Sequence, residues 1–415
     1  MKFPEGAFFT ERREIPIELL NIIVNLSHRD DDNATLVALS TVSHRFARMA
    51  QPLLFSTIRL DPPFYPHSTT NLCQKFHSLI CESPHLATCV RHLSIIDGDH
   101  YLSAFRNKSP LQNTPTLGWV GEEESLPGVL YQLVNIKHLA IRGSRSWLDW
   151  AQLSKNIQRA LLDTVQRPTL SSIDVSRTWG FTSLLACATN LKYLTLSKNS
   201  PGENEATVPE LSPRLLCRPD ALDTTIHPIH DFIMLVQNGS WLDFSRLRSL
   251  TIRSQGRLQR GCRAFLQTLL RSSTALEHLH IRLPSPSSFR HLTSLAPFLP
   301  LRSLYLEIHQ NTHTSRKAYS TWLLQLFDAF PDPTVIDTLA FQASCAPKGD
   351  LFTPEEYLRF DIALTRPELS SLTSVRLGVV GVGQAEALEY YDKLPMVHAR
   401  RILSVERDPE WSLRC

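Results

Sequence analysis

Histidine pairs are the first feature of this sequence that could do chemistry, because imidazole binds metals and transfers protons near neutral pH. His278 and His280 lie two residues apart, and His227 and His230 lie three apart. A zinc site needs at least a third protein ligand at a usable spacing, and neither pair has one. Both pairs are therefore predicted to be ordinary polar positions, and we expect no metal site.

The cysteines do not complete such a ligand set. None of the eight forms a C-x-x-C pair, the spacing that zinc ribbons and thioredoxin-like sites use. Three recur every eight residues, a spacing that no metal module uses, and the others are scattered: Cys73, Cys81, Cys89, Cys187, Cys217, Cys262, Cys345 and Cys415. We expect reduced, half-buried thiols, as in a cytosolic or nuclear protein.

Motifs for nucleotide and acyl-transfer chemistry are also missing. The sequence contains no G-x-G-x-x-G, no G-x-x-x-x-G-K-[ST] and no G-x-S-x-G, and it has only 15 glycines in 415 residues. The 43 Lys and Arg nearly balance the 40 Asp and Glu, leaving a net charge of +3, too little to attract nucleic acid. We therefore expect no catalytic residue, no cofactor and no nucleic-acid partner.

A short apolar triplet of the type L-x-x-L-x-L recurs along most of the chain. Its last two positions are two residues apart, so they share one face of a short strand. The nine occurrences, with a tenth candidate at Phe55/Ile58/Leu60, are Val90/Leu93/Ile95, Ile136/Leu139/Ile141, Leu170/Ile173/Val175, Leu191/Leu194/Leu196, Leu247/Leu250/Ile252, Leu276/Leu279/Ile281, Leu301/Leu304/Leu306, Ile336/Leu339/Phe341 and Leu372/Val375/Leu377.

Segments with helical apolar spacing separate the triplets, at 71–83, 156–167, 230–238, 262–273, 319–330 and 354–366. Strand and helix in regular alternation predict an α/β fold in which each unit buries its apolar face against the next. The pattern resembles a leucine-rich repeat array, although its spacing is longer and less regular than in that family. An ordinary doubly wound α/β domain is the alternative.

Two stretches interrupt the alternation and are predicted to be exposed loops. Residues 106–128 carry three prolines and an acidic run, and residues 198–225 carry four prolines without clear periodicity. Tolerated surface insertion and target binding are both open for them.

The strand side chains that alternate with the buried ones should face the concave surface, which solenoids use for binding. In the middle of the array these are Arg253, His280, Arg282 and Tyr305, with Glu307 as the only acid expected nearby. Because Arg binds carboxylate and phosphate through paired hydrogen bonds, these four residues are a candidate site for an acidic or phosphorylated target segment. The alternative is a solvated face that binds nothing.

The first 60 residues differ, since they contain short amphipathic helices. Pro16 and Glu18 suit the first turn of a helix. An apolar stripe follows at i, i+3, i+4 and i+7: Leu19, Ile22, Ile23 and Leu26. After a polar break at 30–33, one further helix is predicted to be lined by Leu36, Leu39, Ser43, Phe46 and Ala50, and to end at Pro52.

This N-terminal segment resembles an F-box, whose pattern is L-P-x-E-[LI]-[LI] and then L-x-x-L-x-x-V-S followed by two basic residues and an aromatic one. Ile15 stands for the first Leu and His44 for the first basic residue; the direct matches are Pro16, Glu18, Leu19, Leu20, Leu36, Leu39, Val42, Ser43, Arg45 and Phe46. An F-box at 1–60 followed by an irregular leucine-rich solenoid at 61–415 is similar to the F-box families of filamentous and mushroom-forming fungi.

The resemblance implies a three-helix module that binds a Skp-type adaptor and, through it, a cullin. The adaptor contact would use Pro16, Leu19, Leu20, Ile23, Leu36, Leu39, Val42 and Phe46, with Leu39 and Phe46 the first candidates for internal packing. The implied function is target recognition in a ubiquitin ligase, without catalysis by this chain. The alternatives are an adaptor-bound scaffold outside the ligase and an enzyme with an unrecognised site.

The expected location is the cytoplasm, the nucleus or both. The first 16 residues do not form the apolar core of a signal peptide, since Glu5 and Glu11 interrupt them. No apolar run reaches 18 residues, so we expect no membrane partner.

Overall fold

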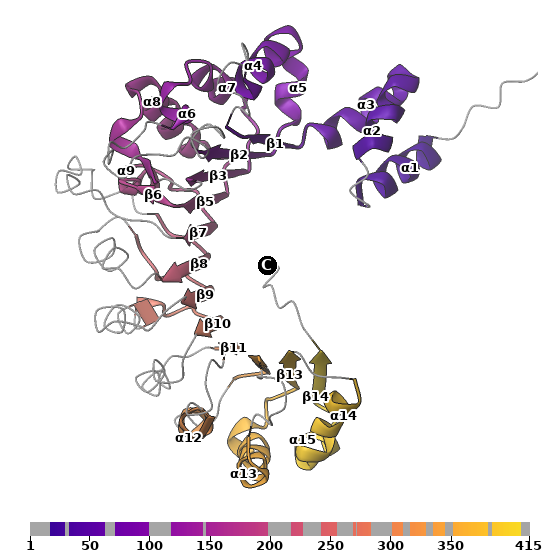
Figure 1. Cartoon of the computed structure of the whole chain (residues 1–415), viewed down its shortest axis with the longest axis vertical. Helices are drawn as coiled ribbons and strands as arrows, with labels where there is room; N and C mark the ends of the chain where they lie inside the picture. The colour runs from indigo at the N-terminus through magenta and orange to yellow at the C-terminus, as the bar shows by residue number, and fades with distance from the viewer. Residues whose placement is uncertain are drawn as a thin grey trace, which may run out of the picture.

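Twelve parallel strands form one open sheet in a computed structural model of the chain (Figure 1). The structure describes residues 17–29, 33–62, 71–98, 118–143, 147–197, 217–226, 242–254, 269–270, 272–283, 301–309, 316–328, 335–344, 352–380 and 384–407. The strands follow one another in chain order, each parallel to its predecessor. The described strands show no reversal of order, which rules out the doubly wound alternative.

The predicted triplets account for most of this sheet, because the last two positions of each triplet, the tenth included, lie in a strand. In sheet order the strands are β1 (Thr57–Leu60), β2 (His92–Asp97), β3 (His138–Gly143), β5 (Ser172–Ser176), β7 (Tyr193–Ser197), β8 (Ala221–Ile226), β9 (Ser249–Ser254), β10 (His278–Leu283), β11 (Ser303–His309), β12 (Thr338–Ser344), β13 (Ser374–Val380) and β14 (Leu403–Arg407). A separate pair, β4 (Leu148–Asp149) and β6 (Thr178–Trp179), continues beyond β3 and β5.

Figure 1 shows the sheet curved into an arc, with strands along its concave side and helices on its convex side. These helices are α4 (Leu72–Glu82), α5 (Pro84–Cys89), α6 (Trp119–Glu122), α7 (Leu126–Gln132), α8 (Lys155–Val165), α9 (Thr182–Ala186), α12 (Arg316–Asp328), α13 (Pro354–Leu364), α14 (Gln384–Lys393) and α15 (Pro395–Ala399). The predicted helices at 71–83, 156–167, 319–330 and 354–366 are confirmed as α4, α8, α12 and α13. The one at 230–238, and most of that at 262–273, lie outside the described residues.

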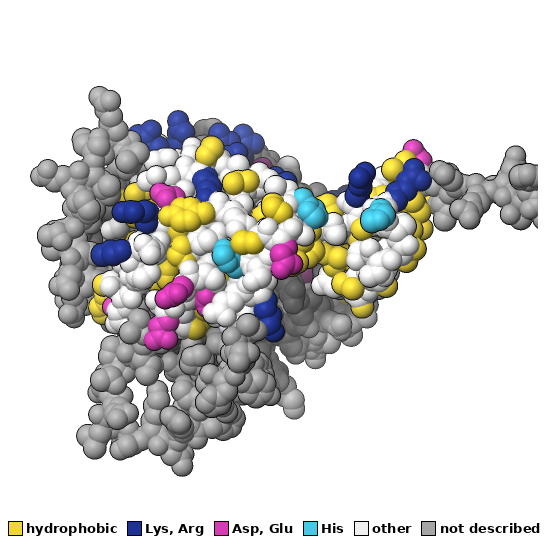
Figure 2. All heavy atoms as spheres, turned by 90° about the horizontal axis from the view of Figure 1, so that it is seen from above, with side chains coloured by type: hydrophobic (Ala, Val, Ile, Leu, Met, Phe, Trp, Pro, Cys, Tyr) yellow, Lys and Arg dark blue, Asp and Glu magenta, His cyan; other side chains and the backbone are white. Residues whose placement is uncertain are grey.

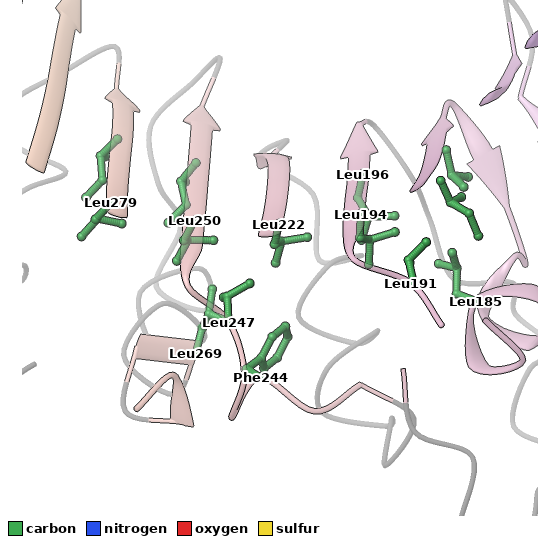
Figure 3. Packing of buried hydrophobic residues seen from close by; sticks show 14 of the residues in the cluster. Leu185, Leu191, Leu194, Leu196, Leu222, Phe244, Leu247, Leu250, Leu269 and Leu279 are labelled. Atoms are coloured by element: carbon green, nitrogen blue, oxygen red, sulfur yellow. The ribbon is translucent and has the colours of Figure 1, made fainter. Parts of the chain in front are cut away.

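The core of the arc is a continuous row of apolar side chains between sheet and helices. Figure 3 shows Leu194, Leu222, Leu250 and Leu279, one from each of four neighbouring strands, on the same side of the sheet. Each is paired in register with the next and is at most 3% exposed. Burying one such side chain stabilises the fold by about 1.5–3 kcal/mol, so the row explains why the triplet recurs.

The loop prediction for the two interruptions is wrong in part. Residues 119–122 and 126–132 form α6 and α7, whose Trp119, Val120 and Leu126 are buried in the arc. Residues 221–226 form β8, which pairs with β7 and β9. Proline and charge at these positions concealed the apolar residues between them; residues 106–117 and 198–216 lie outside the described residues.

Residues 17–54 form a separate three-helix module of α1 (Ile17–Arg29), α2 (Asn33–Val42) and α3 (His44–Leu54). The single helix predicted after the polar break is two, because Ser43 has extended backbone and its hydroxyl accepts a hydrogen bond from the Phe46 N–H at 3.3 Å. Pro52 lies inside α3 instead of ending the helix before it.

The boundary between module and arc is earlier than the predicted residue 60. Leu53 and Leu54 pack on the core of the module, whereas Phe55 and Ile58 pack on the core of the arc. Strand β1 is therefore the first strand of the arc, and the module ends at Leu54.

Candidate partner-binding surfaces

The N-terminal module has a small core of its own. Val24, Leu36 and Ala50, one from each helix, are at most 2% exposed. Partly buried side chains pack around them: Leu39, Phe46, Met49, Leu53 and Leu54. Leu20 of α1 is buried as well, at 4% exposed, so the interior of the module draws on all three helices.

Four large apolar side chains of α1 lie at the surface of the module. Leu19, Ile22, Ile23 and Leu26, here called the α1 stripe, are 44–53% exposed. They are the i, i+3, i+4 and i+7 positions of one helix face, whereas Leu20 and Val24 form the buried face. Figure 2 shows apolar side chains along the edge of this module.

The residues predicted to contact an adaptor divide between surface and interior. Leu19, Ile23 and Val42 are exposed, Val42 by 67%. Leu20 and Leu36 are 4% and 0% exposed, so their assignment to the contact is corrected to internal packing. Leu39 and Phe46 are half-buried against the module core, and Pro16 lies outside the described residues.

The exposed apolar set is also larger than the prediction. The F-box pattern alone did not select Ile17, Ile22, Leu26 and Val37, all of them 42–53% exposed. The i, i+3, i+4, i+7 spacing was the signal that could have found Ile22 and Leu26.

On the arc, the four residues predicted to bind a target do lie on neighbouring strands. Thr251 of β9, His280 of β10 and Tyr305 of β11 are in register, and the His280 and Tyr305 rings are 6.0 Å apart. Arg253, Arg282 and Glu307 occupy the next register position that faces the concave side. The four residues therefore form one patch, here called the concave patch.

The charges of this patch are already paired, contrary to the expectation that Glu307 is its only acid. The Arg253 guanidinium lies 2.8 Å from the Asp223 carboxylate of β8. Strand β8 belongs to the stretch that was predicted to be a loop, so this acid was not expected on the sheet. Glu307 lies 3.5 Å from the Arg282 Nε and 3.6 Å from the His280 Nε2. An acidic ligand would have to displace these carboxylates.

The same pairing of arginine with a neighbouring acid recurs along the concave face. Arg142 of β3 pairs with Asp174 of β5, and Arg376 of β13 lies 2.6 Å from Glu406 of β14. Burial would lower the pKa of Arg376, but hydrogen bonds and charge from Glu406, and then from Tyr305, raise it overall. Each pair bridges adjacent strands, where opposite charges stabilise a sheet by about 0.2–1 kcal/mol.

Burial also shifts the pKa values of one acid on this face and of two thiols elsewhere in the arc. Desolvation raises the pKa of Asp223 above its usual range, although Arg253 and His280 act in the opposite direction. Desolvation raises the pKa of Cys73 and Cys217 to about 12, so both thiols are protonated at neutral pH. Cys73, Cys81, Cys89, Cys187 and Cys217 are free thiols.

Within the described ranges no three His, Cys, Asp or Glu side chains are placed to hold a metal ion. His278 and His280 both lie on β10, and His227 and His230 are outside those ranges. No helix in the described part of the chain is both long and apolar enough to cross a membrane.

Comparison with known proteins adds little to this geometry. No protein-family model and no curated protein matches the chain. Among solved structures, an internalin from Listeria monocytogenes is similar over 85% of this chain and 99% of its own, with 12% sequence identity and a TM-score of 0.25. A similarity at that TM-score carries no argument, so the fold assignment depends on the observed strand order.

Proposed function

We propose that this chain is the target-recognition subunit of a Skp–cullin–F-box ubiquitin ligase. Residues 17–54 bind the Skp-type adaptor, and the concave face of the arc binds the target. The observation that carries the proposal is the α1 stripe, four large apolar side chains at the surface of the module that take no part in its buried core. Such exposed apolar surface is typical of a protein-binding site, and the F-box-like sequence pattern supports a Skp-type adaptor as the partner.

The way the module joins the arc supports this role. Helix α3 contacts α5 of the arc. The Ser56 N–H and hydroxyl donate to the Leu53 carbonyl of α3 at 3.2 and 2.7 Å, and the Ser56 carbonyl accepts from the Arg91 and His92 N–H groups at 2.8 and 2.9 Å. Ser56 therefore links the last turn of α3 to the start of β2. A ligase subunit does no covalent chemistry; it raises the local concentration of a target and orients its lysines. A fixed joint serves that purpose.

The burial pattern divides the module into two sets of residues with different roles. We assign adaptor contact to the α1 stripe and Val42. Leu20 and Leu36 are assigned to holding the helices in place. Alanine at a fully enclosed leucine costs about 2–5 kcal/mol and acts through folding, so changes at Leu20 or Leu36 cannot test the contact itself.

Two negative charges placed on the α1 stripe test the contact directly. In Leu19→Glu/Ile23→Glu both changed side chains are about half exposed, so the module should stay folded. Because interface anchors each contribute about 2 kcal/mol or more, the two changes together should lower adaptor affinity by about a thousandfold. Adaptor capture by the purified full chain, with circular dichroism as the folding check, measures this.

The chain offers a matched control on the same helix. Asn21→Glu/Asn25→Glu adds the same two charges at the same i, i+4 spacing, at exposed positions off the stripe. This variant should capture the adaptor like the unchanged chain. Equal capture by both double variants, or equal loss, would overturn the proposal.

Co-purification separates a ligase subunit from an adaptor-bound scaffold. A cullin recovered together with the adaptor, and lost in Leu19→Glu/Ile23→Glu, supports the ligase role. Adaptor recovered without any cullin, under conditions where another F-box protein retains one, favours the scaffold.

A further inference from the structure

A hollow with a volume of about 400 Å³ opens at the edge of the arc where strands β7, β8 and β9 begin. Three consecutive turns line it, and its lining includes Lys192, Arg218, Asp220 and Arg246 together with Thr189 and Asn190. It lies at the strand ends, apart from both the concave patch and the N-terminal module. Its size is in the range of sites that hold small molecules or single side chains.

The backbone that carries these side chains is fixed by the sheet. The Lys192 N–H donates to the Ser171 carbonyl at 2.8 Å, and the Asp220 N–H donates to the Lys192 carbonyl at 2.9 Å. In the third turn the Asp243 N–H donates to the Cys217 carbonyl at 2.9 Å, and the Asp243 carboxylate accepts from the Ser245 N–H at 2.9 Å. The positive side chains therefore extend from turns whose backbone is held by hydrogen bonds. Such an ordered backbone lowers the entropy cost of binding.

The charge of the hollow is less neutralised than that of the concave face. Arg218 lies 2.9 Å from Asp243, an ion pair at its side. Within the described residues neither Lys192 nor Arg246 has an ion-pair partner, and both are exposed. Three cations against Asp220 and Asp243 leave one net positive charge, which suits one compact anion better than a polyanion.

We propose that this hollow binds a single phosphate or carboxylate group, held by Lys192, Arg218 and Arg246. Arginine offers paired hydrogen bonds to the two oxygens of such a group, and lysine adds a point charge. No histidine or cysteine lines the hollow, so the role assigned is binding. The proposal is independent of the adaptor contact, and either can fail without the other.

Titration calorimetry of the full chain with inorganic phosphate in low-salt buffer tests the site. We expect saturable binding that weakens at least about tenfold in Lys192→Gln/Arg246→Gln, because both changes remove charged hydrogen-bond donors to the anion. Arg248→Gln and Lys137→Gln, exposed cations of the same edge that do not line the hollow, are combined as the control with equal charge change. That control should bind phosphate like the unchanged chain.

Two results would overturn the proposal: no saturable phosphate binding by the unchanged chain, or equal affinities of the two double variants. Unchanged thermal unfolding of all variants without phosphate excludes misfolding as the cause. If the hollow binds phosphate, a comparison of O-phosphoserine with a phosphoserine pentapeptide shows which kind of molecule carries the phosphate group. Tighter binding of the peptide identifies a modified protein segment, and equal or weaker binding of it identifies a free metabolite.

Discussion

Thr224 occupies a core position of β8 that a leucine or isoleucine fills in most neighbouring strands. It is in register with Leu196 of β7 and Ile252 of β9, and it is completely buried. Its hydroxyl has no hydrogen-bond partner among the residues that the structure describes. A buried hydroxyl without a partner costs the free energy of its lost hydration, so this position weakens the middle of the sheet.

Thr224→Val should therefore stabilise the protein. Valine keeps the shape of threonine and removes the unsatisfied hydroxyl, so the free energy of unfolding should rise by about 1–3 kcal/mol. Urea unfolding of both chains measures the change. Thr195→Val is the control, since Thr195 lies on the other face of neighbouring β7 and is only half-buried; it should change stability little. A loss of stability in Thr224→Val would contradict this reading.

The composition of β8 and β14 explains why the sequence analysis did not predict these two strands. In β8, Pro219 and Thr224 stand where other strands have the first and third apolar residue, and in β14 Arg400 stands at the first. Both strands were missed for this reason. Missing β8 also concealed Asp223, and the concave patch therefore seemed to carry unpaired arginines. The nine triplets were predictable because burial requires them to be apolar.

At the scale of the element, α1 shows a second limit of the sequence. The helix is apolar on two faces, one with Leu20 and Val24 and one with Leu19 and Ile23. Periodicity identifies both faces but does not state which one faces α2 and α3. That choice depends on tertiary packing around Leu36 and Ala50, so the structure was needed to separate exposed residues from buried ones.

The last helices of the arc depend on one buried carboxyl group. Asp361 of α13 is 0% exposed and accepts hydrogen bonds from the Met396 and Val397 N–H groups of α15 at 2.8 and 2.9 Å. These N–H groups begin a helix and have no acceptor within it. Asp361 therefore joins α13 to α15, and α15 in turn precedes β14, the terminal strand of the sheet.

Asp361→Ala should loosen this end of the arc. It removes the acceptor for two N–H groups, and the free energy of unfolding should fall by about 1–3 kcal/mol. Asp361→Asn keeps one oxygen acceptor and should lose less. Hydrogen exchange should rise in α15 and β14 and stay unchanged in α1–α3. Equal stability of the alanine variant and the unchanged chain would show that the contact does not hold α15.

At the scale of the whole molecule, the concave face is a sheet of paired charges. Four arginines, at 142, 253, 282 and 376, each face a carboxylate on an adjacent strand. A target segment that carries charges of both signs can form new ion pairs with both members of these pairs. A purely acidic segment would be repelled by the carboxylates of Asp223 and Glu307. Target binding by Arg253, His280, Arg282 and Tyr305 stays a prediction, and mixed charge is the chemistry this face favours.

The joint between the module and the arc gives the last prediction, which depends on the proposed ligase role. A six-residue Gly/Ser insertion between Leu54 and Phe55 separates the two cores at their boundary and adds a flexible tether of about 13 Å. Adaptor capture should be unchanged, because the α1 stripe is intact. Ubiquitin transfer to a bound target should slow on the order of tenfold. A target that moves on a flexible tether has a lower local concentration at the enzyme that carries ubiquitin. The same insertion after Arg407, beyond β14, should leave transfer unchanged. Equal transfer rates for the two insertions would mean that the fixed joint at Ser56 has no part in positioning the target.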